Sequence, residues 1–275
     1  MSNGKFDLDI DLIREWDSEI DETVEEFMPL ALEFTAKGPI PKTCSVFLSF
    51  IASTEFIKNG ILDHAEAENV YAAKILFRSL IEHDLRFQYI WFRASEEKSD
   101  AAAEDYLKHG MFKESLQIAR SWKRVAKILG RDSCLTAHDA LRSVIKATAA
   151  YSNKEIDEQS AQFEYARIIE YIFKKLKWRK NEDIPFLLKI LPSYSDLSCF
   201  VHGSPGAMNI MGSLQAKEEL AADLLNTAAL AFQTAGGVKL FSLLTFCQYD
   251  KKFSRPYLKV DKLLRLVNRP SQPAQ

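Results

Sequence analysis

The chain has 275 residues, of which 47% are hydrophobic and 27% are charged, and its formal net charge is −2 at pH 7. This composition is ordinary for a soluble globular protein with one large domain or two small ones. The four cysteines are scattered without a Cys-x-x-Cys pair, which argues against a disulfide framework or a zinc knuckle and indicates a reducing cytoplasm. The acidic first residues lack the apolar core of a secretory signal, so we expect none.

Helices dominate the expected structure. No proline occurs between Pro41 and Pro185, and only three glycines interrupt that interval. Because both residues destabilise helix interiors, this distribution is typical of a helical protein, and no alternating run predicts a strand. Apolar spacing predicts helices over residues 7–36, 42–58, 64–94, 100–129, 136–151, 152–178, 192–202, 213–248 and 260–268. We therefore expect an all-α fold, a single helical bundle domain of about eight to nine helices.

Local signals mark several ends of these helices. Asp100 and Thr136 are suitable N-caps, and the sequence Ser-Asn-Lys-Glu that begins at Ser152 is a capping box. Gly110 predicts a break within the helix over 100–129, and Gly203 predicts the C-terminal stop of the helix over 192–202.

One segment is apolar enough to require a comparison with membrane helices. Residues 224–247 are mostly apolar but include Asn226, Gln233 and Lys239. A membrane-spanning helix needs about 20 apolar residues with few charges. We therefore expect a buried core helix and no membrane partner.

Charge is distributed unevenly along the chain. Residues 1–36 hold eleven acidic residues, whereas residues 167–180 and the tail from residue 251 are basic. Each block is consistent with a solvated helix face, but basic surface also favours nucleic acid, and the acidic block favours a basic partner. We divide the chain into an acidic N-terminal helical arm (1–40), a helical bundle domain (41–248) and a basic C-terminal tail (249–275).

Two polar rows lie among apolar neighbours, each with the four-residue spacing that places its members on one helix face. The first row is Tyr194, Ser198 and His202. The second row is Arg78, Glu82 and Arg86. Because buried polar side chains need hydrogen-bond partners, the two rows are expected to meet where their helices pack together. The alternative is that each row is the wet face of its helix.

These motifs carry a resemblance to a known group of proteins. Arg78 with Glu82, followed by Tyr194, Ser198, His202 and Gly203, resembles an uncharacterised bacterial family of all-helical proteins, a domain of unknown function. The resemblance covers most of the chain between roughly residues 45 and 235. It implies an all-helical fold and no established activity.

A more distant resemblance is to the HEPN class of helical domains, many of which are dimeric ribonucleases of bacterial defence and toxin systems. The HEPN mark is an Arg followed by a His after four to six residues. Arg78 with His83 matches it, although Ser79 replaces the usual polar amide, acid or imidazole. Arg131 with His138 also matches it, although the pair falls at an expected loop and cap. This resemblance implies a cytoplasmic homodimer that acts on RNA.

The residue types suit RNA cleavage without a metal ion. An Arg fork matches phosphate oxygens, and His transfers protons near neutral pH. We expect Arg78 to hold the phosphate and Glu82 to orient it, with Tyr194 and Ser198 as donors beside them. His202, at the negative end of its helix, is the expected acid, and His83 is the alternative under the HEPN interpretation.

Other interpretations remain open. The two rows could form a structural polar network that fixes helix pairing without chemistry. The chain could instead be a non-enzymatic interaction module that binds a partner protein through its acidic helix or basic tail. Weaker candidates are a metal site at His64 and Glu68 and a nucleophilic Cys199 beside His202. The chain lacks a P-loop, a dinucleotide-binding glycine motif and a GxSxG motif, so we expect no cofactor and no metal.

Overall fold

The computed structural model describes residues 8–131, 135–176, 186–214 and 216–267, and within these ranges every element is helical. The expected all-α class is therefore confirmed. The α-helices are α1 (Ile10–Lys37), α2 (Pro41–Glu66), α3 (Val70–Glu97), α4 (Ala101–Asp105), α5 (Met111–Ile128), α6 (Ala137–Val144), α7 (Asn153–Ala161), α8 (Tyr165–Leu176), α9 (Phe186–Val201), α10 (Pro205–Ser213), α11 (Lys217–Cys247) and α12 (Ser254–Val267). Short turns η1 (Tyr106–Gly110), η2 (Lys146–Ala150) and η3 (Lys251–Phe253) join some of them.

The expected eight to nine helices are too few, because long predicted segments are divided. The predicted helix over 100–129 is divided by η1, a π-helical turn that ends at Gly110, where the break was expected. The segment over 152–178 is divided into α7 and α8. Helix α10 was not expected; it begins with Pro205, just after Gly203 has ended α9 with a φ of +58°. Cys134, Trp178 and the basic residues 177–180 lie outside the described ranges.

The capping signals are mostly confirmed, with one change of role. Thr136 and Ser152 each form a capping box, with Asp139 and Glu155 respectively. Asp100 does not cap its own helix. Its carboxylate instead accepts hydrogen bonds from the backbone N–H groups of Lys42 at 3.1 Å and Thr43 at 2.7 Å. It thus caps α2, whose first N–H groups have no partner within the helix.

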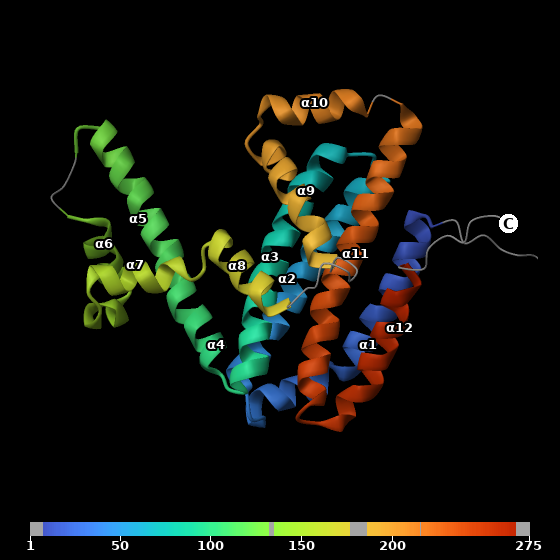
Figure 1. Cartoon of the computed structure of the whole chain (residues 1–275), viewed down its shortest axis with the longest axis horizontal. Coiled ribbons are helices and arrows are strands. Elements are labelled where there is room, and N and C mark those ends of the chain that lie inside the picture. The colour runs from blue at the N-terminus through green and yellow to red at the C-terminus, as the bar shows by residue number, and fades with distance from the viewer. Residues whose placement is uncertain (1–7, 132–134, 177–185, 215, 268–275) are drawn as a thin grey trace, which may run out of the picture.

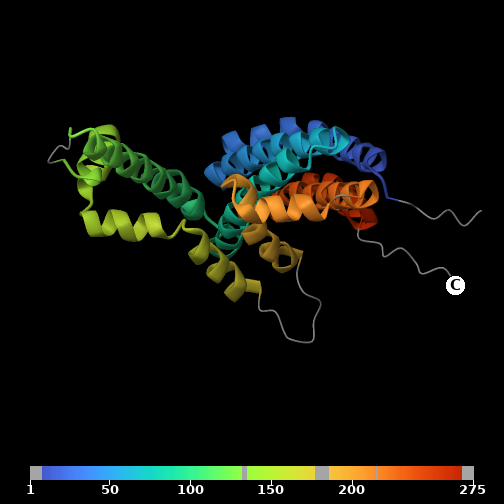
Figure 2. The ribbon, with the colours of Figure 1, turned by 90° about the horizontal axis from the view of Figure 1, so that it is seen from above.

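The main core is formed by α1, α2, α3, α11 and α12, which lie side by side with α11 in the middle (Figures 1 and 2). A chain of aromatic contacts links four of these helices through Phe34, Phe47, Phe87, Phe246 and the adjacent Phe253. Residues of the expected acidic arm, in α1, and of the expected basic tail, in α12, both pack into this core. Helices α8 and α9 lie against α3.

Helices α5, α6 and α7 project away from this bundle, as Figures 1 and 2 show. They have a small core of their own, formed by Phe112, Leu116, Leu141 and Ile156. We call α5 to α7 the projecting arm. Its attachment to the bundle runs through α4 and the π-helical turn η1 and through the start of α8.

Helix α11 is the one described helix that is long and apolar enough to cross a membrane. Of the most apolar 18-residue segment of α11, 61% is buried inside the protein. Lys239 of the same helix is 1% exposed. It has the position of a core helix, as its polar residues indicate. The cytoplasmic location expected from the cysteines stays a prediction.

The neighbouring glycines of α11 should respond in opposite ways to alanine. A Cβ atom at Gly236 would lie 2.3 Å from Leu264 Cδ2 of α12, so Gly236→Ala should push α12 away and cost about 1–3 kcal/mol. A Cβ atom at Gly237 meets nothing within 4 Å, so Gly237→Ala should stabilise the helix by about 0.5–1 kcal/mol. Urea unfolding of both variants measures the difference. Equal effects would contradict the close packing of α11 and α12.

Candidate functional site

Three of the polar side chains singled out in the sequence meet between α3 and α9. The Tyr194 hydroxyl donates to Glu82 Oε1 at 3.0 Å and accepts from Arg78 Nη2 at 3.2 Å. Arg78 also pairs with Glu82 along α3 at 3.1 Å, and its guanidinium lies 4.9 Å from the centroid of the Tyr194 ring. Each of the three side chains therefore contacts the other two.

The antiparallel packing of α3 and α9 positions this contact. Near the start of α3, the Tyr71 hydroxyl donates to the Phe200 carbonyl at 2.7 Å, and the two rings are 5.4 Å apart. Leu197 and Phe200 bury the apolar face of α9. Since residues three or four apart share a helix face, Tyr194 lies on the same face of α9 as Leu197 and falls opposite Arg78 and Glu82, which begin about two turns after Tyr71 on α3.

Two further helices extend the contact. The Tyr165 ring of α8 lies 5.5 Å from the Tyr194 ring, and the Arg86 guanidinium and the Lys113 ammonium lie 5.6 and 5.7 Å from the Tyr165 ring. Lys113, from α5, also donates to the Phe163 carbonyl at 2.6 Å. We call the resulting cluster the polar seam; its members are Arg78, Glu82, Arg86, Lys113, Tyr165 and Tyr194.

The polar seam carries an excess of positive charge, with three cationic side chains and one carboxylate. Arg78 and Glu82 are half-buried, and Arg78 Nε is buried with no hydrogen-bond partner among the described residues. Burial raises the pKa of Tyr194, as does the neighbouring Glu82, and burial also raises that of Tyr165. Burial and the nearby Arg86 lower the pKa of Lys113. A half-buried cationic site with an unpaired N–H donor suits an anionic ligand.

The other predicted site residues lie outside the polar seam. His202 is exposed just beyond the end of α9, and eight residues of helix separate it from Tyr194, about 12 Å along the axis. Ser198 is half-buried between them, and none of its described contacts is with Arg78 or Glu82. His83 Nδ1 hydrogen-bonds to the Ser79 carbonyl of its own helix at 2.8 Å. The catalytic roles expected for these three residues stay predictions.

The second HEPN-like pair lies on the projecting arm. His138 Nε2 lies 3.1 Å from Asp157 Oδ1, an atom that also pairs with Arg120 at 3.0 Å. Asp157 and Arg120 border a groove of about 540 Å³ between α5, α7 and α8, and Lys113 of the polar seam also lines this groove. Arg131 is exposed after the end of α5. The two HEPN-like pairs therefore lie on different parts of the molecule: Arg78 and His83 on the bundle, and Arg131 and His138 on the projecting arm.

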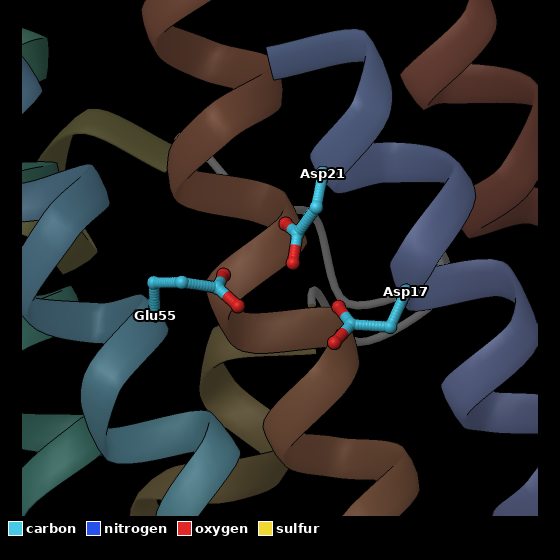
Figure 3. A group of neighbouring side chains, drawn as sticks. All are labelled: Asp17, Asp21 and Glu55. Atoms are coloured by element: carbon cyan, nitrogen blue, oxygen red, sulfur yellow. The ribbon is translucent and has the colours of Figure 1, made fainter. Parts of the chain in front are cut away.

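A buried ionic cluster was missed by the sequence analysis. Asp17 and Asp21 of α1 and Glu55 of α2 point toward one another (Figure 3); Asp17 is buried, whereas the Asp21 side chain is 40% exposed. Lys58, which is fully buried, bonds to Asp17 and Glu55, and Lys239 bonds to Asp21 at 2.7 Å and to Glu55 at 2.6 Å. These acids looked like part of a solvated face, because nothing in their spacing reveals the two lysines.

The three carboxylates lie close enough to share a metal ion, but each of them already pairs with at least one of the two ammonium groups of Lys58 and Lys239, which leaves the cluster with one negative charge in excess. Burial raises the pKa of Asp17. Burial also opposes ionisation of Glu55, but Lys239 and Lys58 outweigh it and lower its pKa to about 2. We therefore interpret this cluster as a structural connection of α1, α2 and α11. The weaker metal candidate at His64 lies at the end of α2 rather than at the expected helix start, and its neighbours Asp63 and Glu66 pair with Arg14.

Asp84, on α3, is a second residue that the sequence analysis did not single out. It is 3% exposed, and its described hydrogen bond is from the Gln88 amide at 2.9 Å. Burial raises its pKa to about 7, although the Gln88 hydrogen bond partly offsets this. The spacing of Asp84 relative to the apolar residues of α3 could have indicated its burial, because it lies one turn after Leu80 and Ile81 and one turn before Phe87.

Comparison with known proteins identifies a family but no activity. The family of unknown function DUF5677 matches residues 43–219, well over half of the chain. This segment extends from α2 to the start of α11 and includes all six residues of the polar seam. No curated protein and no solved structure is significantly similar to the chain. The expected relationship to an uncharacterised helical family is confirmed at this level: the chain belongs to the family of unknown function DUF5677.

Proposed function

We propose that the protein binds single-stranded RNA and cleaves it at the polar seam without a metal ion. The observation that carries this proposal is the half-buried cationic cluster, in which Arg78 Nε has no hydrogen-bond partner within the described part of the chain and lies beside two tyrosine rings. Arginine N–H groups match phosphate oxygens, and aromatic faces stack with bases. A phosphodiester with an adjacent base offers both of these groups.

The contacts of Tyr194 suggest a proton route. Glu82 accepts the proton of the ribose 2′-hydroxyl while the 2′-oxygen attacks phosphorus. Arg78 stabilises the charge on the phosphorane oxygens, and the bond to the 5′-oxygen breaks as that oxygen takes the proton of Tyr194. The hydrogen bond between Tyr194 and Glu82, 3.0 Å long, then returns the proton from Glu82 to the Tyr194 oxygen. The products are a 2′,3′-cyclic phosphate and a free 5′-hydroxyl.

This route gives the acid role to Tyr194 because His202 lies a further two turns along the chain. Kinship with HEPN ribonucleases, and with it a role in bacterial defence or as a toxin, is part of the proposal. The second candidate is a structural polar network without chemistry. The mutual contacts of Arg78, Glu82 and Tyr194 also fit this role, and a protein that does not bind RNA would have this role alone.

Binding separates the two candidates. Arg86→Ala should weaken the binding of a fluorescein-labelled single-stranded RNA at least tenfold in a fluorescence anisotropy titration, because it removes one of three cations of the polar seam. Arg14→Ala, on the acidic helix α1 where Arg14 pairs with Asp63 and Glu66, is the matched control and should bind like the wild type. No binding by the wild type, or an equal loss in both variants, would contradict RNA binding at the polar seam.

A further inference from the structure

One face of α5 is apolar and uncovered. Its exposed fractions are 50% for Met111, 59% for Ile118, 70% for Trp122, 44% for Val125 and 62% for Leu129 at the helix end. The opposite side of α5 is the buried one, where Phe112 and Leu116 pack in the core of the arm. Monomeric proteins rarely expose contiguous apolar patches of more than roughly a few hundred Å². We call this face the α5 stripe.

The α5 stripe has the spacing of a helix-pairing seam. Positions 111, 115, 118, 122, 125 and 129 alternate by four and three residues, and all except Ser115 are large and apolar. This alternation is the a/d pattern of a coiled coil, which keeps a narrow stripe facing one partner helix. The pattern therefore indicates a helix as the partner.

The charges of α5 lie away from the stripe. Its basic residues are Lys113, Arg120, Lys123, Arg124 and Lys127, and none of them falls at an a, d, e or g position. The flanking e and g positions within the exposed part are Glu114, Ala119, Ser121, Ala126 and Ile128, with a single charge among them. An anionic membrane or a nucleic acid would need bases beside the apolar residues. Flanks with only one charge and with small side chains at Ala119, Ser121 and Ala126 instead permit the close approach of a like helix with little repulsion.

We propose that the α5 stripe pairs with the α5 stripe of a second copy in an antiparallel, two-fold symmetric contact. In this arrangement Met111 of one copy lies opposite Leu129 of the other, and Ile118 lies opposite Trp122. Ser115 lies opposite Val125. Exchange of the two copies by the two-fold axis gives the same pairs again. The same surface of each copy is therefore complementary to itself, as an isologous contact requires. The argument does not depend on RNA binding, because the stripe contains no residue of the polar seam.

Molar mass in solution tests the pairing. Size-exclusion chromatography with light scattering should give a dimer for the wild-type chain and a monomer for Ile118→Glu, which places a charge in each symmetric half of the contact. Val144→Glu, at another exposed apolar residue of the arm, is the matched control and should remain a dimer. A monomeric wild type, or an Ile118→Glu variant that folds and stays dimeric, would overturn the proposal. A monomeric wild type that binds vesicles rich in phosphatidylserine would assign the stripe to a membrane instead.

A disulfide test checks the register without any destabilising charge. Met111→Cys with Leu129→Cys in one chain should give a disulfide-linked dimer on mild oxidation, because these positions lie opposite one another in the antiparallel pair. Leu129→Cys alone should give no more linked dimer than the wild type, which measures the background from the native cysteines. Efficient linkage by Leu129→Cys alone would indicate a parallel pair and contradict the proposed arrangement.

Discussion

Lys58→Met is expected to lower the free energy of unfolding by about 3–5 kcal/mol. The Lys58 side chain is 1% exposed and bonds to Asp17 on α1 and Glu55 on α2. Its removal leaves the Asp17 carboxylate buried without its partner, and the cost of burying an unpaired charge is large. Lys239 still neutralises Glu55, so the loss falls mainly on the connection between α1 and α2. Urea unfolding monitored by circular dichroism measures the change.

Lys42→Met is the matched control, because it removes a lysine near the start of the same helix. The Lys42 side chain is 55% exposed and pairs with an equally exposed Glu104, so its loss should change stability by less than about 1 kcal/mol. Similar small effects in both variants would mean that water reaches the pair of Lys58 and Asp17. The cluster would then not be the connection that we infer.

Asp84→Asn is expected to stabilise the protein above neutral pH, by up to about 4 kcal/mol. Burial raises the pKa of Asp84 to about 7 from an ordinary value of 3.8. Between about pH 4 and pH 7 the folded chain therefore keeps a proton that the unfolded chain has already released. The wild type loses stability as the pH rises through this window. Asparagine keeps the shape and cannot ionise, and its amide can still bond to Gln88.

The measurement is the free energy of unfolding of both proteins at pH 5 and pH 8. The advantage of Asp84→Asn should be about 2–3 kcal/mol larger at pH 8 than at pH 5, because at pH 8 the wild type must bury a carboxylate or hold a proton against the solvent. Asp196→Asn, at an exposed position of α9, should give no such change with pH. A constant difference between Asp84→Asn and the wild type would show that Asp84 does not titrate with folding.

The sequence predicted the features that depend on local spacing. The helical class, the caps at Thr136 and Ser152 and the stop at Gly203 follow from residues within one or two turns of each other. The meeting of Tyr194 with Arg78 and Glu82 followed from matched four-residue spacing, and the structure brings these three together. Ser198 and His202 lie one and two turns farther along the chain, and no described hydrogen bond or ion pair joins them to Arg78 or Glu82.

The remaining features depend on the packing of helices distant in the sequence. Lys113 reaches Tyr165 only because the projecting arm returns to the bundle at the start of α8. The acids of α1 looked solvated, since nothing local distinguishes Asp17, which is buried against Lys58, from its exposed neighbours. The sequence predicts the helices of this region but not their separation from the bundle, because the core of the arm arises from four apolar residues spread over 45 positions of the chain.

Cleavage of a labelled single-stranded RNA in the presence of EDTA tests the central claim most directly. The wild type should produce 2′,3′-cyclic phosphate ends, and Glu82→Gln and Tyr194→Phe, which keep the shapes of their side chains, should each lose at least about 100-fold in rate. His202→Ala and His83→Ala should keep most of the activity, since neither residue contacts Glu82 or Tyr194 among the described contacts. Activity that survives Glu82→Gln and Tyr194→Phe, or a folded wild type that binds RNA without cutting it, would contradict catalysis at the polar seam.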